Sequence, residues 1–142
     1  MVILSFSVKK DELLSGVKIR TTRLYTPVKW EQWKATIPPN NTKVLDLWWR
    51  PRTKERLYIG SRPGKDLCYV MFVDLNGRPW PCRSWEDRPI TPMSTEEFRQ
   101  YLKEEGFAGE LEQFLRFFED HYSPLEGRLF QSIAFPPMEE KQ

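Results

Sequence analysis

The predicted fold is decided by the stretch Gly16-Val17-Lys18-Ile19-Arg20-Thr21-Thr22-Arg23. The residues before it are an apolar segment of strand length, Val2–Val8, and a segment long enough for about two helical turns, Lys9–Ser15. Glycine tolerates the left-handed backbone with which many helices end, so Gly16 is expected to end this short helix. The basic and hydroxyl side chains that follow are too dense for a strand that only supports a core.

The stretch contains the pattern G-x-K-x-x-T-x-R, with Gly16, Lys18, Thr21 and Arg23 at the four fixed positions. This pattern, behind an N-terminal strand and a short helix, resembles the signature of the ASCH domain, a small β-barrel superfamily related to the RNA-binding PUA domains. The resemblance implies a single ASCH/PUA-like domain over residues 1–142. The implied fold class is α+β, with a PUA-like mixed β-barrel of five or six strands flanked by helices.

Length and composition limit the class of protein. A chain of 142 residues suits one domain, and it has no apolar run of about 18 residues and no secretory signal pattern. Cys68 and Cys82 are too far apart for a C-x-x-C motif, and the single histidine, His121, excludes a histidine-rich metal site. We therefore expect a cytoplasmic protein with reduced cysteines, no metal, no cofactor and no membrane partner. Whether the cysteines pair, and the oligomeric state, stay open.

Charge is distributed unevenly along the chain. Residues 1–65 hold 14 Lys and Arg against 5 Asp and Glu, a net charge of +9, whereas residues 66–142 hold 8 against 15, a net charge of −7. A basic half favours an anionic partner such as RNA, although two oppositely charged halves also attract each other within one fold.

The most basic connection joins a predicted strand at Lys43–Trp49 to one at Leu57–Ile59. Its four cationic side chains are Arg50, Arg52, Lys54 and Arg56. Pro51 and the lack of apolar residues predict that this connection is a solvated loop. These side chains are placed to contact a phosphate backbone, or to keep a sheet edge from pairing with another chain. The sequence does not choose between these roles.

Tryptophan marks two further segments. Thr26 and Pro27 predict a helix start, and Trp30 and Trp33 then share one helix face, where a core role is favoured over base stacking. Residues 78–92 are rich in proline, tryptophan and arginine, which predicts an irregular loop. We expect Trp80 and Trp85 in this loop to bind RNA by stacking.

The remaining elements are predicted from periodicity and caps. Leu67–Leu75 is expected to be a buried central strand, and Ser94 with Glu97 forms a capping box for a helix that reaches about Glu104. A second helix is expected from residue 108 or 109 to His121, then a strand at Arg128–Phe135 and a frayed tail from residue 136.

A second motif of the resembled family is an acidic residue followed by glycine and an aromatic or apolar residue, and Glu105-Gly106-Phe107 matches it. Some members of that family are amidohydrolases acting on an acylated cytidine such as N4-acetylcytidine. The resemblance assigns the catalytic roles to Thr21 as nucleophile, Lys18 as base and Glu105 as proton relay. Glu105 paired with Lys18 would instead hold the lysine charged, which suits a binding site better. In a straight strand Lys18 and Thr21 point to opposite faces, so they meet only if the chain bends after Gly16.

Three functions therefore compete. The first is an RNA- or nucleotide-binding module whose basic cleft includes Gly16, Arg20 and Arg23. The second is a hydrolase of a modified nucleoside, or a ribonuclease that uses Lys, Arg and Glu. The third is a protein-interaction adaptor that presents the acidic helices between Glu96 and Glu119. The sequence favours the first and leaves enzymatic activity and the ligand open.

Overall fold

The computed structural model describes residues 2–6, 9–39, 41–75, 77–86, 88–107, 111–122 and 128–137. The strands are β1 (Val2–Phe6), β2 (Arg20–Leu24), β3 (Leu45–Trp49), β4 (Leu57–Arg62), β5 (Lys65–Leu75), β6 (Arg78–Ser84), β7 (Thr91–Pro92) and β8 (Leu129–Ala134). The helices are α1 (Lys10–Leu14), α2 (Pro27–Lys34), α3 (Thr95–Glu104) and α4 (Leu111–Tyr122). These elements confirm the α+β class. Among the described residues, no helix combines the length and the apolar character that crossing a membrane requires.

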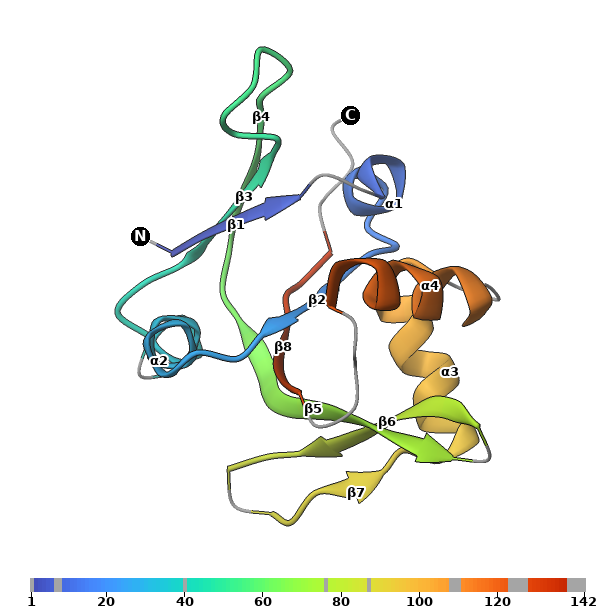
Figure 1. Cartoon of the computed structure of the whole chain (residues 1–142). Helices are drawn as coiled ribbons and strands as arrows, with labels where there is room; N and C mark the ends of the chain where they lie inside the picture. Colours follow the sequence, from blue (N-terminus) through green and yellow to red (C-terminus); the bar gives the residue numbers. More distant parts are fainter. Residues whose placement is uncertain are drawn as a thin grey trace.

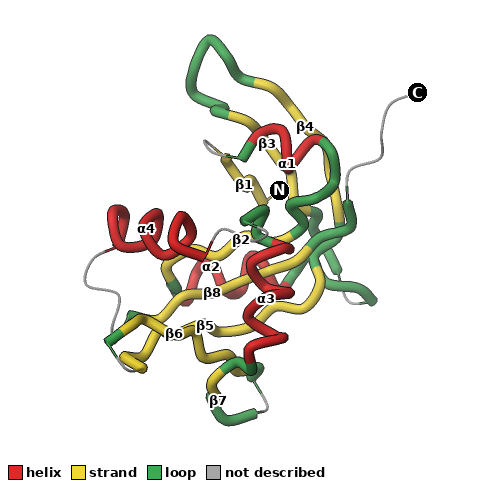
Figure 2. Tube along the Cα trace, turned by 90° about the vertical axis from the view of Figure 1, so that its right-hand side faces the viewer, coloured by secondary structure: helices red, strands yellow, loops and turns green. Residues whose placement is uncertain are grey.

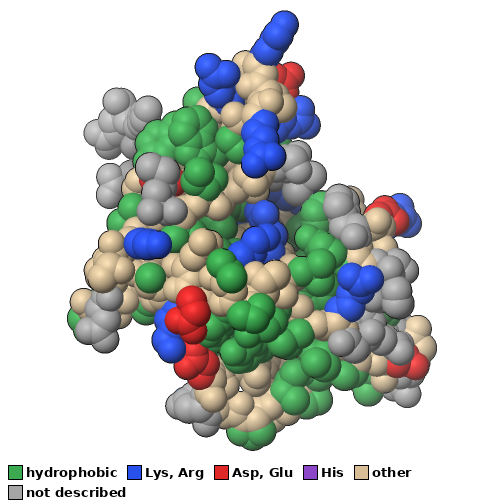
Figure 3. Space-filling view, turned by 60° about the vertical axis from the view of Figure 1, so that its left-hand side comes forward, with side chains coloured by type: hydrophobic (Ala, Val, Ile, Leu, Met, Phe, Trp, Pro, Cys, Tyr) green, Lys and Arg blue, Asp and Glu red, His purple; other side chains and the backbone are tan. Residues whose placement is uncertain are grey.

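The strands form two sheets. The small sheet has the order β1-β3-β4, with β1 parallel to β3 and β3 antiparallel to β4. The large sheet has the order β2-β8-β5-β6-β7, and all its neighbours are antiparallel. The chain changes sheet between β1 and β2, between β2 and β3, and where β4 leads directly into β5 (Figure 1). The β3–β4 hairpin projects beyond the rest of the fold in both views (Figures 1 and 2), and it carries Lys and Arg side chains at its end (Figure 3).

The described strands do not close into one barrel. β1 and β2 are not paired with each other, and a side chain joins them instead: Arg23 Nη2 donates to the Ser5 carbonyl at 2.6 Å. The part of the chain that is described holds eight strands in two sheets, more than the five or six expected in a single barrel. The PUA-like barrel therefore stays a prediction.

Residues 78–84 differ from the predicted irregular loop, because they form strand β6 against β5. Pro79 and Pro81 are two residues apart, so both lack an N–H on the same edge of the strand. That edge faces away from β5, since the Pro81 carbonyl accepts from Met93 N at 3.0 Å. The prolines therefore leave the β5 ladder intact. The loop prediction was wrong for residues 78–84 and for residues 91–92, which form strand β7, and Trp80 lies in a strand.

The predicted helix starts at residues 26 and 94 are confirmed. Thr26 Oγ1 accepts from Lys29 N at 3.1 Å, and Ser94 and Glu97 exchange both bonds of a capping box. The first residues of the predicted second helix, 108–110, lie outside the described part of the chain, and α4 is described from Leu111. Of the predicted tail, only Pro136 and Pro137 are described.

Two hydrophobic clusters hold the layers together. One lies under the small sheet and α2, with Leu4, Leu47, Trp33 and Phe135 among its members. The other lies between the large sheet and helices α3 and α4, which share one side of that sheet (Figure 1). Trp30 is buried and stacks on Tyr69 at 3.9 Å, so the expected core role of the α2 tryptophans is confirmed.

Candidate functional site

The segment between α1 and β2 brings the first motif to one surface. Gly16 has a φ of 81°, and the N–H groups of Val17 and Lys18 both donate to Glu12 O at 2.9 Å. Ile19 N then donates to Glu104 O at 2.8 Å, which fixes this irregular segment against the end of α3. Lys18 therefore precedes the regular strand, and the chain bends as the sequence required. Lys18 and Thr21 line the same pocket.

The second motif forms the end of α3. Glu105 is the C-terminal cap, and Gly106 follows with a φ of 87° that favours glycine. A Cβ at Gly106 would also stand only 3.3 Å from the Lys18 Cβ, so the two motifs approach each other closely here. Phe107 N donates back to Leu102 O at 2.8 Å, which holds the aromatic residue beside the helix end.

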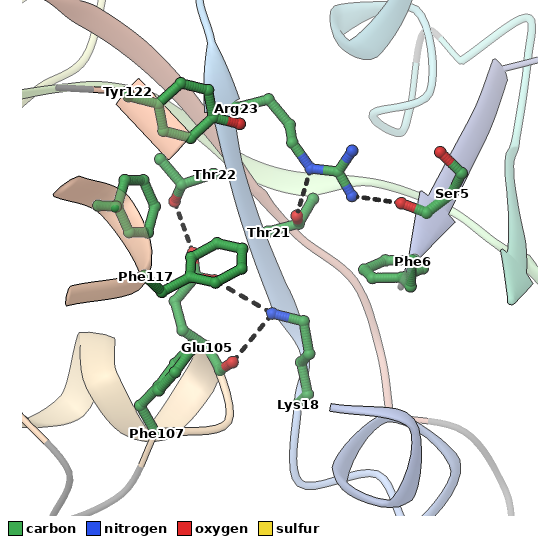
Figure 4. A pocket seen from close by; sticks show the side chains of 11 residues that line it. Ser5, Phe6, Lys18, Thr21, Thr22, Arg23, Glu105, Phe107, Phe117 and Tyr122 are labelled. Atoms are coloured by element: carbon green, nitrogen blue, oxygen red, sulfur yellow. Dashed lines mark hydrogen bonds and ion pairs between the residues drawn. The ribbon is translucent and has the colours of Figure 1, made fainter. Parts of the chain in front are cut away.

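A buried ion pair joins the two motifs. Lys18 Nζ lies 3.1 Å from Glu105 Oε2, and both side chains are almost completely buried. Lys18 Nζ also donates to the Glu105 and Arg20 carbonyls at 2.9 Å each, so all three ammonium hydrogens have protein acceptors. Figure 4 shows the two bonds from Lys18 to Glu105. Burial lowers the pKa of Lys18, and the Glu105 carboxylate opposes that shift.

The other oxygen of Glu105 receives a bond that the sequence reasoning missed. Thr22 Oγ1 donates to Glu105 Oε1 at 2.5 Å, and Thr22 Oγ1 also contacts the Tyr101 hydroxyl. Because a hydroxyl has one hydrogen to donate, Tyr101 donates to Thr22 and Thr22 donates to the carboxylate. Burial, and then the charge of Glu105, raise the pKa of Tyr101 well above its ordinary value. Each carboxylate oxygen of Glu105 therefore has a hydrogen-bond donor, Lys18 for one and Thr22 for the other.

Thr21, the predicted nucleophile, has a different environment. Its Oγ1 accepts from Arg23 Nε at 3.1 Å, and the Arg23 guanidinium lies 5.5 Å from the centre of the Phe6 ring. Arg23 thereby spans from β2 to β1 as one of the residues that line the pocket (Figure 4). The threonine in contact with the carboxylate is Thr22 and not Thr21.

These groups line a pocket of about 150 Å³. Its polar side chains come from β1, from β2 and the segment before it, and from the end of α3, and its aromatic side chains come from β1, α4 and the residue after Gly106. The lining consists of Ser5, Phe6, Lys18, Thr21, Thr22, Arg23, Glu105, Phe107, Phe117, Phe118 and Tyr122. The sequence predicted Phe118 only as part of the core face of this helix and gave Phe117 and Tyr122 no role, so all three were missed as pocket residues. Their spacing of four, as in Phe118 and Tyr122, continues the stripe toward the pocket.

Other predicted ligand residues lie away from this pocket. Arg20 is buried behind its wall, where Nε binds Glu104 at 3.0 Å, Nη1 binds Ser132 at 2.9 Å and Nη2 pairs with Asp66. The cations Arg50, Arg52, Lys54 and Arg56 lie in the exposed β3–β4 connection. Gly16 is not among the lining residues, and its positive φ permits the turn that precedes Lys18.

The two tryptophans of residues 78–92 are also outside the pocket. Trp80 packs edge-on against Phe98 and donates to the Met93 carbonyl at 2.8 Å. Trp85 donates to Asp66 Oδ1 at 2.8 Å and borders a separate hollow of about 400 Å³ beside α2. The acidic groups of that hollow are already paired, Glu86 with Lys34 and Asp66 with Arg20.

No group of three or more His, Cys, Asp and Glu side chains in the described residues is arranged to hold a metal ion. Cys68 and Cys82 are both buried and are not joined by a disulfide. Comparison with protein-family models, with curated proteins and with solved structures returns no match.

Replacing Lys18 with methionine should destabilise the fold strongly, because it leaves the Glu105 carboxylate buried without its cation. The expected loss is about 3–5 kcal/mol of unfolding free energy, measured by urea denaturation. The double variant Lys18→Met/Glu105→Leu should lose much less. Arg50→Met, which breaks the exposed pair with Glu55, is the matched control and should have little effect. Equal effects of Lys18→Met and Arg50→Met would contradict the buried pair.

The pKa of Lys18 should be measurable by NMR titration of its side-chain methylene carbon. We expect a midpoint below the 10.5 of an ordinary lysine, because burial penalises the charged form. Glu105→Gln should lower the midpoint further, since the carboxylate favours the ammonium. A midpoint at or above 10.5, or an upward shift in the variant, would mean that Lys18 is not desolvated as described.

Proposed function

We propose that this chain is an ASCH-like domain that binds RNA or a nucleotide through a pyrimidine base held in the pocket described above. The observation that carries the proposal is the meeting of both motifs in one aromatic-lined pocket: Lys18, Thr21 and Arg23 from the first, Glu105 and Phe107 from the second. Segments 87 residues apart in sequence share a buried ion pair there. The finer fold assignment, a PUA-like barrel that is open between β1 and β2, belongs to the same proposal.

The size and lining of the pocket support a single-ring base. A cavity of about 150 Å³ holds a ring the size of benzene, and this pocket has about that volume. Phe6, Phe107 and Tyr122 offer ring faces and edges, which bind every base through its π-face. A purine, with two fused rings, needs more room than this pocket has.

The polar wall supports recognition of a ligand that carries both hydrogen-bond donors and acceptors. Thr21 and Thr22 contribute hydroxyls, and Glu105 contributes a carboxylate whose two oxygens are held by Lys18 and Thr22. Arg23 lines the pocket, and Lys9 Nζ stands 4.4 Å from the ring centre of Phe107, another lining residue. These cations suit the phosphate of a nucleotide whose base is inside.

Hydrolysis of an acylated nucleoside is the second candidate, and one distance favours it. Thr22 Oγ1 lies 2.5 Å from Glu105 Oε1, the separation of a nucleophile from its general base. Lys18 is less suited to that role, since all three of its hydrogens have acceptors and a base needs a lone pair. The test is release of cytidine from N4-acetylcytidine. Release that is lost in Thr22→Val and kept in Thr21→Val would support this candidate over binding alone.

Binding can be tested by calorimetry with cytidine, uridine and adenosine 5′-monophosphates. We expect the pyrimidine nucleotides to bind more tightly than the purine nucleotide. Arg23→Met should weaken pyrimidine binding by about 10- to 100-fold, the range for a hydrogen bond to a charged group. Lys103→Met is the control, because it also removes one positive charge, at an exposed position of α3 outside the pocket.

Two results would overturn the proposal. One is a folded protein that binds none of the three nucleotides. The other is pyrimidine binding that Arg23→Met and Lys103→Met weaken equally, which would place the ligand elsewhere.

A further inference from the structure

The outer face of the small sheet carries aromatic side chains in a row that leads away from the pocket. In the β1–β3 ladder Ser5 is paired with Trp48, and in the β3–β4 ladder Trp48 is paired with Tyr58. Ser5 is exposed, and its neighbours Leu4 and Phe6 point into the core. Because side chains alternate along a strand, Ser5, Trp48 and Tyr58 form one row across the outer face.

A bulge in β4 brings Tyr58 into this row. The pairing runs from Leu47 with Gly60 to Trp48 with Tyr58, so Ile59 is the extra residue. The Trp48 and Tyr58 rings are in contact, with centres 5.0 Å apart, and Tyr58 is 48% exposed. The Tyr58 hydroxyl is held by Asp46 Oδ1 at 3.1 Å, which fixes the ring without covering it.

The row begins at the pocket itself. Ser5 is one of the pocket-lining residues, and Arg23 binds its carbonyl. From Ser5 to Tyr58 the row crosses two strand spacings, or about 10 Å. A stacked single strand rises about 3.4 Å per nucleotide, so this path is long enough for about three nucleotides.

Cations border the far end of the row. The β3–β4 connection contains Arg50, Arg52, Lys54 and Arg56 with one acid, Glu55, which is paired with Arg50 at 2.8 Å. Figure 3 shows Lys and Arg side chains at this projecting end, with a hydrophobic patch directly beneath it. The surface next to Tyr58 is therefore both aromatic and cationic.

This combination fits one kind of partner best. Exposed rings bind the faces of unpaired bases, which a duplex keeps inside its own stack. With Arg50 paired to Glu55, the connection keeps a net positive charge through Arg52, Lys54 and Arg56, which complements a phosphate backbone with its one negative charge per nucleotide. The face is also continuous with the pocket, so a strand whose base occupies the pocket can extend along it.

We propose that the outer face of the small sheet, with Trp48, Tyr58 and the β3–β4 cations, binds nucleotides of single-stranded RNA next to the one in the pocket. This deepens the proposed function, on which it rests: the partner is a polynucleotide strand and not a free nucleoside. The aromatic pair stacks on bases, and the hairpin cations contact the phosphates.

The stacking part is tested with a fluorescently labelled eight-nucleotide cytidine RNA in an anisotropy titration. The octamer should bind more tightly than cytidine 5′-monophosphate. Tyr58→Leu should weaken octamer binding by about 5- to 100-fold, the range for removing one stacking ring. The matched control Tyr58→Phe keeps the ring and should bind nearly as well as the unchanged chain, and Tyr58→Leu should leave monophosphate binding unaltered.

The charge part is tested by the salt dependence of octamer affinity. Each phosphate contact on a single strand contributes about −0.7 to the slope of log K against log salt. Arg52→Gln/Lys54→Gln should therefore make the slope shallower by about 1.4. Lys29→Gln/Lys103→Gln removes two exposed charges elsewhere and should leave the slope as it was.

The outcomes separate this inference from the proposed function. Monophosphate binding with an octamer that binds no tighter, or that ignores Tyr58→Leu, overturns the inference and leaves the pocket function standing. Equal affinity for the octamer and for its duplex with guanosine RNA also overturns it. Octamer binding that depends on Tyr58, without monophosphate binding, supports the face and overturns the pocket as the base site.

Discussion

The rest of the site depends on the buried ion pair between Lys18 and Glu105. A buried charge is costly unless it is paired and hydrogen-bonded, and here both conditions are met: the ammonium has three acceptors, and the carboxylate takes bonds from Lys18 and Thr22. The pair joins the segment before β2 to the end of α3. It thus fixes two chain segments that contribute to different layers, and the pocket opens between them.

The same pair influences what the pocket can do. Its charges are satisfied before any ligand arrives, so the polar wall is preorganised and needs little rearrangement on binding. A lysine held as an ammonium stabilises an anionic neighbour better than it removes a proton. The carboxylate, in contrast, lies within reach of Thr22. The geometry therefore favours recognition, and any hydrolysis would pass through Glu105 and Thr22.

Local signals in the sequence predicted local structure well: the caps at Thr26 and Ser94 and the turn at Gly16 agree with the structure. The contact between Lys18 and Glu105, 87 residues apart, was expected only from the resemblance that links the two motifs, and the structure contains it. The errors are long-range. Residues 78–84 form a strand because their prolines lie on the edge away from β5, and no local pattern reveals which edge has a partner. Thr22 and the α4 aromatics were missed since their direction depends on how β2 and α4 pack.

The most direct test of the central claim is a crystal structure of the protein with cytidine 5′-monophosphate. We expect the base within the pocket, with its ring against Phe107 or Tyr122 and its polar edge toward Thr22 and Glu105. The phosphate should lie beside Arg23. A base bound elsewhere, for example in the hollow beside Trp85, with the pocket unchanged, would contradict the account.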